Sequence, residues 1–373
     1  MISLLRFLFL VLSTVCCSFQ LSAQSLSIST VDHNLITCFP ATAVDSSGKP
    51  YTCEASAVLY ADKKMYIGSD RDFPGASALF TLPFSLPLAN YGADVKVVDQ
   101  PLINACRKWE DMSLSPDGRL VFAMTGFDRV KKGSHDWDVF NMLVYWPAGM
   151  EDSAQLLAET DSGGIKSSLM LRHRISRVLA DKDFPDGMPY FKTEALCALP
   201  GNRLIFGIRE YGSDYDHFSY AFRLLECSYR QSGNRLELND DLREICRLDS
   251  LRAYGNKNPL AISSMEYDPL TDRIWVLTSY EDNSGPAAVT GAYLWVWTPE
   301  ALEKCEAPRA VRDPSGLHQH FTHKAEGITL ISPSTLLVIC DDDRNLLPLE
   351  NQADIIRQTH QSAYYILQIE EQK

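Results

Sequence analysis

The sequence predicts an all-β fold, a β-propeller, on three observations. A short hairpin recurs along the chain, turn-forming residues lie inside each copy, and another strand-like run follows each hairpin. Four-stranded meanders repeated around an axis form a propeller, an architecture that leaves only short, protected sheet edges. The chain has 373 residues, of which 45% are hydrophobic, so it can bury a sizeable core. We expect five or six four-stranded antiparallel blades, with six preferred.

Each copy of the hairpin starts with a glutamate, continues through an apolar-polar alternation and a turn, and ends in a four-residue β run. Four copies begin at Glu54, Glu110, Glu194 and Glu326. A fifth copy has Ser263 at the position of the glutamate. Alternation of this kind is typical of half-buried strands, so we expect each copy to supply the first two strands of a blade.

The spacing of the copies leaves the number of blades open. Glu194 follows Glu110 by 84 residues, whereas a four-stranded blade needs about 40 to 50 residues. The interval therefore holds either a sixth, degenerate blade or a long insertion, and residues 164–192 have the composition of a long loop or insertion. Helix content should be low, with short helices expected over residues 301–305 and 346–359.

The first 23 residues have the pattern of a secretory signal peptide. One positive charge precedes an apolar stretch over residues 7–15, and small residues lie before Gln24. Lipoprotein processing at Cys16 or Cys17 is the less favoured alternative, because Val15, before Cys16, is a poor match for the small residue required there. We expect an exported protein, periplasmic or secreted, with one propeller domain over residues 24–373 and no transmembrane segment.

The cysteines fit an exported protein. Of ten cysteines, two lie within the first 23 residues, which leaves eight, and an even number permits disulfides. Cys227 and Cys246 lie in neighbouring strand-like runs and are the best candidate pair. Cys197 and Cys340 lie inside apolar runs and are expected to be buried thiols. No C-x-x-C spacing supports a zinc ribbon or a thioredoxin-like motif.

Charge and missing motifs exclude several functions. The formal net charge is −13, and no basic run is present, so nucleic-acid binding is not expected. No Gly-x-Ser-x-Gly, Walker or Gly-x-Gly-x-x-Gly motif supports an α/β-hydrolase, nucleotide-hydrolase or dinucleotide interpretation. The expected partners are an anionic small molecule or a protein ligand on the channel rim, and the protein is expected to be a monomer.

Three copies carry a lysine two residues before the glutamate: Lys108, Lys192 and Lys324. Residues two apart on a strand share a face, so each lysine and its glutamate should point into the central channel together. The second strands end on the same rim, at Asp70, Arg209 and Asp341 among others. One mouth of the channel should therefore gather these lysines, Arg209 and the carboxyl groups.

Converging carboxylates need neutralisation, because like charges at short range raise one another's pKa. In the first interpretation the lysines pair with the glutamates and fix the blades. In the second a bound Ca²⁺ supplies the positive charge, because this ion takes about six to eight oxygen ligands. The candidate metal ligands are Glu54, Glu110, Glu194, Glu326 and Asp341. The candidate substrate-binding residues, which would make an anion pocket beside the metal, are Lys108, Lys192, Lys324 and Arg209.

Two short motifs, at residues 323–328 and 337–343, resemble the closing blade of bacterial phytase-like β-propeller proteins, sometimes described as esterase-like. The resemblance extends over most of residues 50–345 and implies a fold more than an activity. The glutamate at the start of an inner strand is similar, more distantly, to that of gluconolactonase and paraoxonase propellers. In those proteins such a glutamate ligates a central Ca²⁺, which implies the same role for a repeat glutamate here.

Two functions remain open from the sequence. One is a divalent-metal-dependent ester or phosphoester hydrolase, with Glu326 and His323 as the catalytic residues and His323 as the candidate general base. The other is a non-catalytic propeller that binds a ligand or a protein on its charged rim. The only histidine cluster, His318, His320 and His323, is expected to be a surface loop rather than a zinc site.

Overall fold

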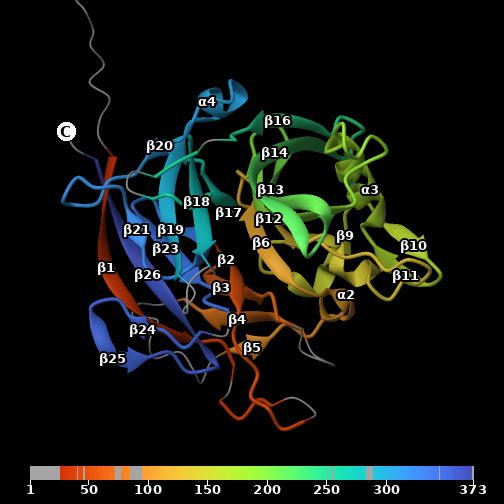
Figure 1. Ribbon diagram of the computed structural model, residues 1–373. Helices are drawn as coiled ribbons and strands as arrows, with labels where there is room; N and C mark the ends of the chain where they lie inside the picture. Colours follow the sequence, from red (N-terminus) through yellow and green to blue (C-terminus); the bar gives the residue numbers. More distant parts are fainter. Residues whose placement is uncertain are drawn as a thin grey trace, which may run out of the picture.

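The chain forms five antiparallel blades around a central channel (Figure 1). The computed structural model describes residues 26–39, 41–44, 47–71, 77–84, 95–249, 251–253, 256–282, 289–343 and 345–371. The predicted signal peptide lies outside the described residues. No helix within the described ranges is long and apolar enough to cross a membrane.

The innermost strand of each blade is the first strand of the recurrent hairpin. The first blade contains β2 (Ala55–Ala61), β3 (Lys64–Ser69), β4 (Leu79–Pro83) and β5 (Lys96–Val97). The second contains β6 (Trp109–Leu114), β7 (Leu120–Thr125), β8 (Leu143–Pro147) and β9 (Gln155–Leu156). The third contains β12 (Tyr190–Leu199), β13 (Arg203–Asp214), β14 (His217–Ser232), β15 (Arg235–Leu238) and β16 (Arg243–Arg247). The fourth contains β17 (Ala261–Asp268), β18 (Arg273–Asp282), β19 (Val289–Trp297), β20 (Arg309–Ala310) and β21 (His320–Phe321).

The fifth blade joins the two ends of the described chain. Its strand order is β22 (Ala325–Ser332), β23 (Thr335–Cys340), β26 (Gln361–Glu371) and β1 (Leu26–Thr37). The antiparallel register runs from Leu26 opposite Glu371 to Thr37 opposite Gln361. The N-terminal strand is thus the outer strand of the last blade, and its backbone hydrogen bonds close the ring.

The preference for six blades is wrong, because the long interval between Glu110 and Glu194 holds an insertion. After the second blade the chain forms a small hairpin, β10 (Thr160–Ser162) and β11 (Ile165–Ser167), and then the helix α3 (Leu169–Val178). The two short strands pair only with each other among the described strands. They bury too little surface to act as a blade.

The remaining helices are short. They are α2 (Pro101–Ala105), α4 (Pro299–Glu303) and the 3₁₀ turns η2 (Asp138–Phe140) and η3 (Glu151–Ser153). The helix predicted near residues 301–305 is confirmed. The helix predicted over residues 346–359 is wrong: β24 (Pro348–Leu349) and β25 (Gln352–Ile356) form a hairpin there. Its turn contains Asn351 at a φ of 61°, a left-handed conformation that asparagine tolerates.

Two disulfides occur, and the predicted pair is not one of them. Cys38 is bonded to Cys53, and Cys246 to Cys305. In the register of β14 and β16, Cys246 lies opposite Leu224, three residues from Cys227, so those two thiols do not meet. Cys227 is instead a buried thiol. The prediction of buried thiols at Cys197 and Cys340 is confirmed.

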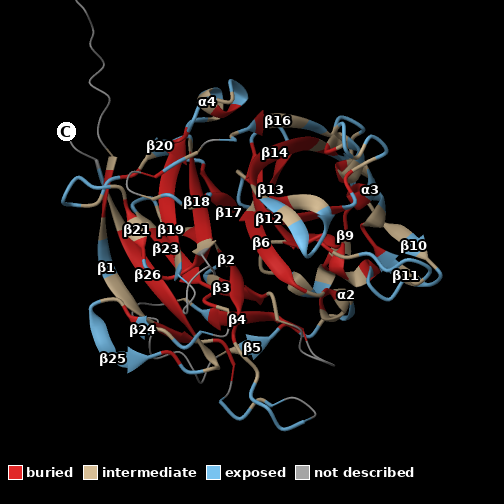
Figure 2. Ribbon diagram, viewed as in Figure 1, coloured by how far each residue is buried: buried red, intermediate tan, exposed pale blue. Residues whose placement is uncertain are grey.

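The core lies between the blades, and the inner strands around the channel are buried (Figure 2). Trp109, Trp146, Trp275 and Trp297 are among the largest side chains that are fully buried. Such large aromatic side chains contribute strongly to the hydrophobic stabilisation of the blade interfaces. This rigid packing fixes the positions of the inner strands, and with them the side chains at the channel mouth.

Candidate channel-mouth site

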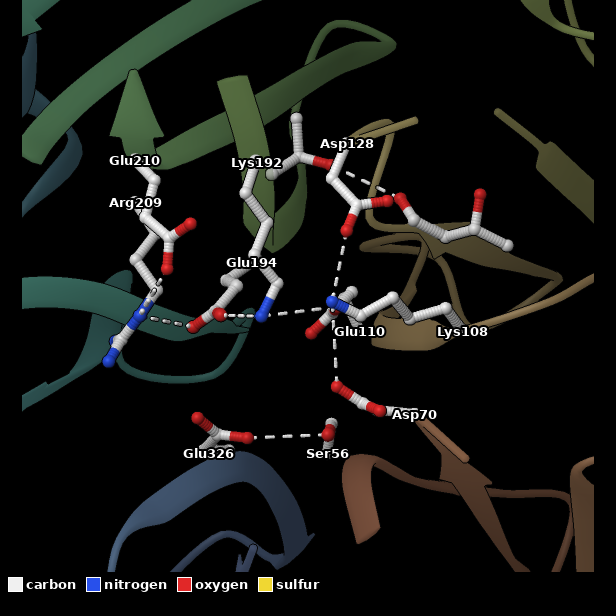
Figure 3. A network of polar contacts seen from close by, with 12 residues as sticks. Ser56, Asp70, Lys108, Glu110, Asp128, Lys192, Glu194, Arg209, Glu210 and Glu326 are labelled. Carbon is white, nitrogen blue, oxygen red and sulfur yellow. Dashed lines mark hydrogen bonds and ion pairs between the residues drawn. The ribbon is translucent and has the colours of Figure 1, made fainter. Parts of the chain in front are cut away.

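The three Lys-x-Glu segments meet at one mouth of the channel, as predicted. Figure 3 shows both members of the first two segments and Glu326 of the third. Lys108 Nζ lies 3.4 Å from Glu110 Oε1, and Lys324 Nζ lies 2.9 Å from Glu326 Oε1. Lys192 Nζ donates to Glu194 Oε1. All of these side chains are buried.

Ion pairs between blades join these segments into one network. Lys192 Nζ also lies 3.3 Å from Glu110 Oε1, across the interface between the third and second blades. Arg209 in β13 bridges two glutamates. Its Nε lies 3.2 Å from Glu194, and its Nη2 lies 3.4 Å from Glu281. Glu281 in the fourth blade lies 2.8 Å from Lys324 Nζ in the fifth. Acids and bases therefore alternate through four of the five blades.

The first blade completes the ring. Asp70, which follows β3, lies 3.6 Å from Lys108 Nζ. The Ser56 hydroxyl lies 3.3 Å from both Glu326 Oε2 and Asp341 Oδ2. The network thus touches every blade, and removal of one member will disturb its neighbours on either side.

The inner strands aim these side chains into the channel through β-bulges. Near the channel mouth, the register with the second strand skips one residue of the inner strand in each blade. These residues are Ser56, Glu110, Glu194, Ser263 and Glu326. A bulged residue is unpaired in the ladder, and bulges often redirect a side chain next to a functional site.

This register corrects the predicted repeat in the first blade. Ser56, and not Glu54, occupies the position of Glu110, Glu194 and Glu326. Glu54 takes the position of the lysines and lies 3.8 Å from Arg71. The sequence comparison missed this shift of two residues because it aligned the glutamates rather than the bulges.

In the fourth blade, the serine at the glutamate position makes room for an arginine. Arg209 Nη1 donates to the hydroxyl oxygens of Ser263 at 3.0 Å and Ser279 at 2.7 Å. A glutamate at residue 263 would place a larger side chain where the guanidinium lies. The exception in the repeat is thus explained by the neighbouring blade.

Acidic groups outnumber basic groups in this network. Within 4 Å of the four cationic side chains Lys108, Lys192, Lys324 and Arg209 lie eight carboxyl groups, those of Asp70, Glu110, Asp128, Glu194, Glu210, Glu281, Glu326 and Asp343. Arg129 adds a fifth cation, 3.4 Å from Asp128, but five cations still cannot neutralise eight carboxylates. Some of the carboxyl groups are therefore expected to keep a proton.

The environments of two neighbouring glutamates shift their pKa values in opposite directions. Burial raises the pKa of Glu110 well above its usual range, against the effect of Lys192 and Lys108, and the carboxylates of Glu194 and Asp70 raise it further. Burial also acts to raise the pKa of Glu194, but Arg209 and Lys192 hold it below its usual value. Glu110 is thus favoured as a neutral acid and Glu194 as an anion.

A second pair of acids lies at Ser56. Burial raises the pKa of Asp341 well above its ordinary value, and the nearby Glu326 raises it further. The pKa of Glu326 is also raised, first by burial, although Lys324 opposes the shift. The Ser56 hydroxyl lies within 3.3 Å of both carboxyl groups and can donate its proton to either of them.

The predicted catalytic histidine faces away from this network. His323 Nδ1 lies 2.7 Å from Asp342 Oδ2, and its ring makes edge contacts with His33 and Tyr365. His323 and Lys324 both precede β22, so strand alternation does not decide where they point. The contacts of the His323 ring are with Asp342, His33 and Tyr365 and not with the glutamates of the mouth.

The other predicted histidines pack against aromatic side chains of the fourth blade. His318 contacts Trp295, and His320 contacts Tyr293. Within the part of the chain that the structure describes, no group of three or more His, Cys, Asp or Glu side chains is arranged to hold a metal ion.

The donor set at the mouth does not fit a calcium ion well. The ammonium groups of Lys108 and Lys192 lie within 3.4 Å of Glu110, and Lys324 lies 2.9 Å from Glu326. A divalent cation bound by these glutamates would face these ammonium groups at short range, with strong repulsion in a buried site. The predicted Ca²⁺ site remains a prediction, and we derive no chemistry from it.

Below the mouth, polar side chains that sequence reasoning missed tie the blades together. Asp111 Oδ2 accepts a hydrogen bond from the backbone of Leu196 at 2.7 Å, and its Oδ1 accepts one from Ser264 Oγ at 3.0 Å. Glu266 Oε1 accepts from the backbone of Leu330 at 3.2 Å. Asp111 and Glu266 could have been found in the sequence, because each is an acidic residue within an otherwise apolar inner strand.

Comparisons with known proteins give similarity in fold only. No protein-family model matches the chain, and no curated protein matches it. An α-L-arabinofuranosidase from Fusarium graminearum, solved with an iminosugar inhibitor, is 8% identical with a TM-score of 0.42, covering 91% of this chain and 98% of its own. A luciferin-regenerating enzyme is 10% identical with a TM-score of 0.37, covering 92% and 95%. An endo-arabinanase from Bacillus licheniformis is 11% identical with a TM-score of 0.35, covering 86% and 93%. The resemblance to phytase-like proteins remains a prediction.

Proposed function

We propose that this protein is a hydrolase and that the channel mouth is its active site. The observation that carries the proposal is the pair Glu110 and Glu194, two carboxyl groups that share Lys192 while their pKa values shift in opposite directions. Titratable neighbours whose environments separate their pKa values are suited to act as acid and base at one pH. Glu110 is the proposed general acid, and Glu194 is the proposed general base.

The proposed reaction is the cleavage of one bond by water. Glu110 donates its proton to the leaving oxygen while the bond to that oxygen breaks. Glu194 accepts a proton from the attacking water, whose oxygen forms the new bond to the substrate. The proton then returns from Glu194 to Glu110 through solvent, so the enzyme ends the cycle unchanged. Lys192 positions both carboxyl groups.

Backbone conformation at the mouth supports a functional role. Lys108, Phe127 and Asp343 have φ values of 66°, 54° and 50°, in the left-handed region that such residues rarely adopt. Strained residues are found at active sites, where the surrounding structure keeps them in place. Lys108 and Asp343 belong to the network, and Phe127 directly precedes Asp128.

We propose a neutral substrate, an ester or a glycoside. The sequence alone predicted an anionic substrate held by Lys108, Lys192, Lys324 and Arg209. In the structure each of these cations has at least one carboxyl partner within 3.5 Å, and carboxyl groups are in excess. An anion would therefore meet net repulsion at the mouth. This argument also disfavours a phosphoester substrate.

The test is a hydrolysis screen with p-nitrophenyl esters, glycosides and phosphate, followed by the variant Glu110→Gln. General acid catalysis contributes about 10²- to 10⁴-fold, so Glu110→Gln should lower kcat by that range while the fold remains intact. The matched control is Glu237→Gln, at an exposed glutamate on the outer strand β15. Full activity of Glu110→Gln would contradict the proposal. No hydrolysis anywhere in the screen would favour the non-catalytic binding propeller.

A further inference from the structure

A cleft of about 580 Å³ lies beside the channel mouth. Its walls come from the segment after β7, from α3 and from the turn between β13 and β14. The lining residues used below are Asp128, Val130, Trp137, Arg172, Tyr190 and Tyr215. A concave surface of this size can hold a ligand larger than a single small molecule fragment.

Two exposed aromatic side chains line this cleft. Trp137 is 41% exposed and Tyr215 is 65% exposed. They are the only aromatic side chains among the exposed large hydrophobic residues that the structure describes. Val130, which is 43% exposed, lines the same cleft. Because these exposed apolar side chains converge in one concave place, they indicate a binding surface.

Two buried polar groups in the cleft wall have no hydrogen-bond partner among the described residues. They are Oδ1 of Asp128 and Nε of Arg172. The side chains are held firmly by their other atoms, since Asp128 Oδ2 accepts from Lys108 at 3.1 Å and Arg172 Nη2 donates to the backbone oxygen of Pro189 at 2.9 Å. One acceptor and one donor are thus fixed and unsatisfied beside the aromatic surface, which points to a polar ligand.

The cleft is connected to the proposed catalytic groups. Asp128 is itself a member of the network through Lys108. The Tyr190 hydroxyl donates to Glu210 Oε2 at 2.5 Å, and Glu210 lies 3.9 Å from Arg209. A second hollow of about 250 Å³ shares Val130 and Arg172 with the cleft. The cleft therefore borders the network at Asp128.

We propose that the cleft binds a neutral saccharide, which makes the bond cleaved at the mouth a glycosidic bond. The apolar C–H faces of sugar rings would pack on Trp137 and Tyr215. Sugar hydroxyls both donate and accept, so they would satisfy Asp128 and Arg172 together. This inference rests on the proposed function for the reaction, but the binding itself does not require turnover.

Binding is tested in the full-length mature chain carrying Glu110→Gln, which blocks the proposed turnover. The probes are cellotetraose, xylotetraose and arabinotetraose. Their binding is measured by calorimetry and by tryptophan fluorescence. We expect at least one to bind, and we expect Trp137→Ala and Tyr215→Ala each to weaken it by about tenfold or more. The control is Leu270→Ala. Leu270 is 70% exposed and lines a different hollow, formed by the hairpin turns of the blades.

The outcomes separate this inference from the proposed function. If no tetrasaccharide binds, or if binding ignores both aromatic substitutions, the saccharide cleft is wrong. Hydrolysis of a simple ester that depends on Glu110 would then still uphold the catalytic proposal. Conversely, saccharide binding that depends on Trp137 and Tyr215, with no effect of Glu110→Gln on any hydrolysis, would uphold the cleft and overturn the catalytic proposal.

Discussion

The ammonium group of Lys192 in the third blade lies 3.3 Å from Oε1 of Glu110 in the second blade. The same nitrogen donates to Glu194 in its own strand. One buried cation therefore serves two carboxyl groups on neighbouring blades. This arrangement links the stability of the blade interface to the charge state of the proposed acid and base.

Replacing Lys192 with methionine should destabilise the protein strongly. The substitution leaves buried carboxyl groups without their shared cation, which costs about 3–5 kcal/mol. Thermal or urea unfolding measures the change. The control is Lys166→Met, which removes an exposed pair with Glu159 and should change stability by about 0–1 kcal/mol. Equal effects of the two substitutions would contradict the role of Lys192.

Stability should fall as the pH rises toward 8 because of Glu266. Burial raises the pKa of this carboxyl group from 4.5 to about 8. The folded state therefore binds a proton that the unfolded state releases, so the contribution of Glu266 is greatest below pH 4.5 and is lost as the pH rises through about 8. The loss should be about 5 kcal/mol.

The variant Glu266→Gln tests this pH dependence. The amide cannot ionise, so the difference in stability between the variant and the wild type should change steadily in the variant's favour from pH 4.5 to pH 8. Urea unfolding at several pH values measures it. A difference that does not vary with pH would show that Glu266 titrates as an ordinary glutamate.

Chelation should leave the protein unaffected. The lysines already supply positive charge to the glutamates at the mouth, so we expect the same melting temperature with Ca²⁺ and with a chelator. A tightly held ion would add RT ln(1 + [L]/Kd) to the stability, so its removal would lower the melting temperature. Such a drop, with metal found in the purified protein, would restore the calcium interpretation.

The bond between Cys246 and Cys305 closes a loop of 59 residues and should contribute about 2–4 kcal/mol. Cys305→Ala should therefore lower the melting temperature, whereas Cys227→Ala removes a buried thiol and should leave the disulfide intact. Peptide mapping under non-reducing conditions identifies the bonded pair. Recovery of a peptide that links Cys227 to Cys246 would contradict the structure.

Much of the fold could be predicted, because a repeated hairpin leaves a local signal in the sequence. The Lys-x-Glu segments also predicted which side chains meet at the mouth, although the glutamates reach the channel from β-bulges and not through the regular alternation of a strand. The blade number could not be predicted, because an insertion with its own hairpin resembles a degenerate blade. The pairing of β1 with β26 was missed for a different reason: it joins segments that are far apart in sequence.

Details of the site depended on contacts that local patterns do not record. The bulge that places Ser56 at the position of Glu110 becomes visible only when strand pairing is known. Arg209 fills the space at Ser263 from another blade. The cleft of Trp137 and Tyr215 likewise combines two segments from different blades, so neither residue stood out in the sequence.

The protonation states of Glu110 and Glu194 test the central claim most directly. Infrared difference spectra of the wild type against Glu110→Gln and against Glu194→Gln report each carboxyl group separately at about pH 6, above the usual range for glutamate. We expect the first difference to contain the band of a protonated carboxyl group and the second to contain the bands of a carboxylate. Carboxylate bands in both spectra would contradict the assignment of Glu110 as the acid.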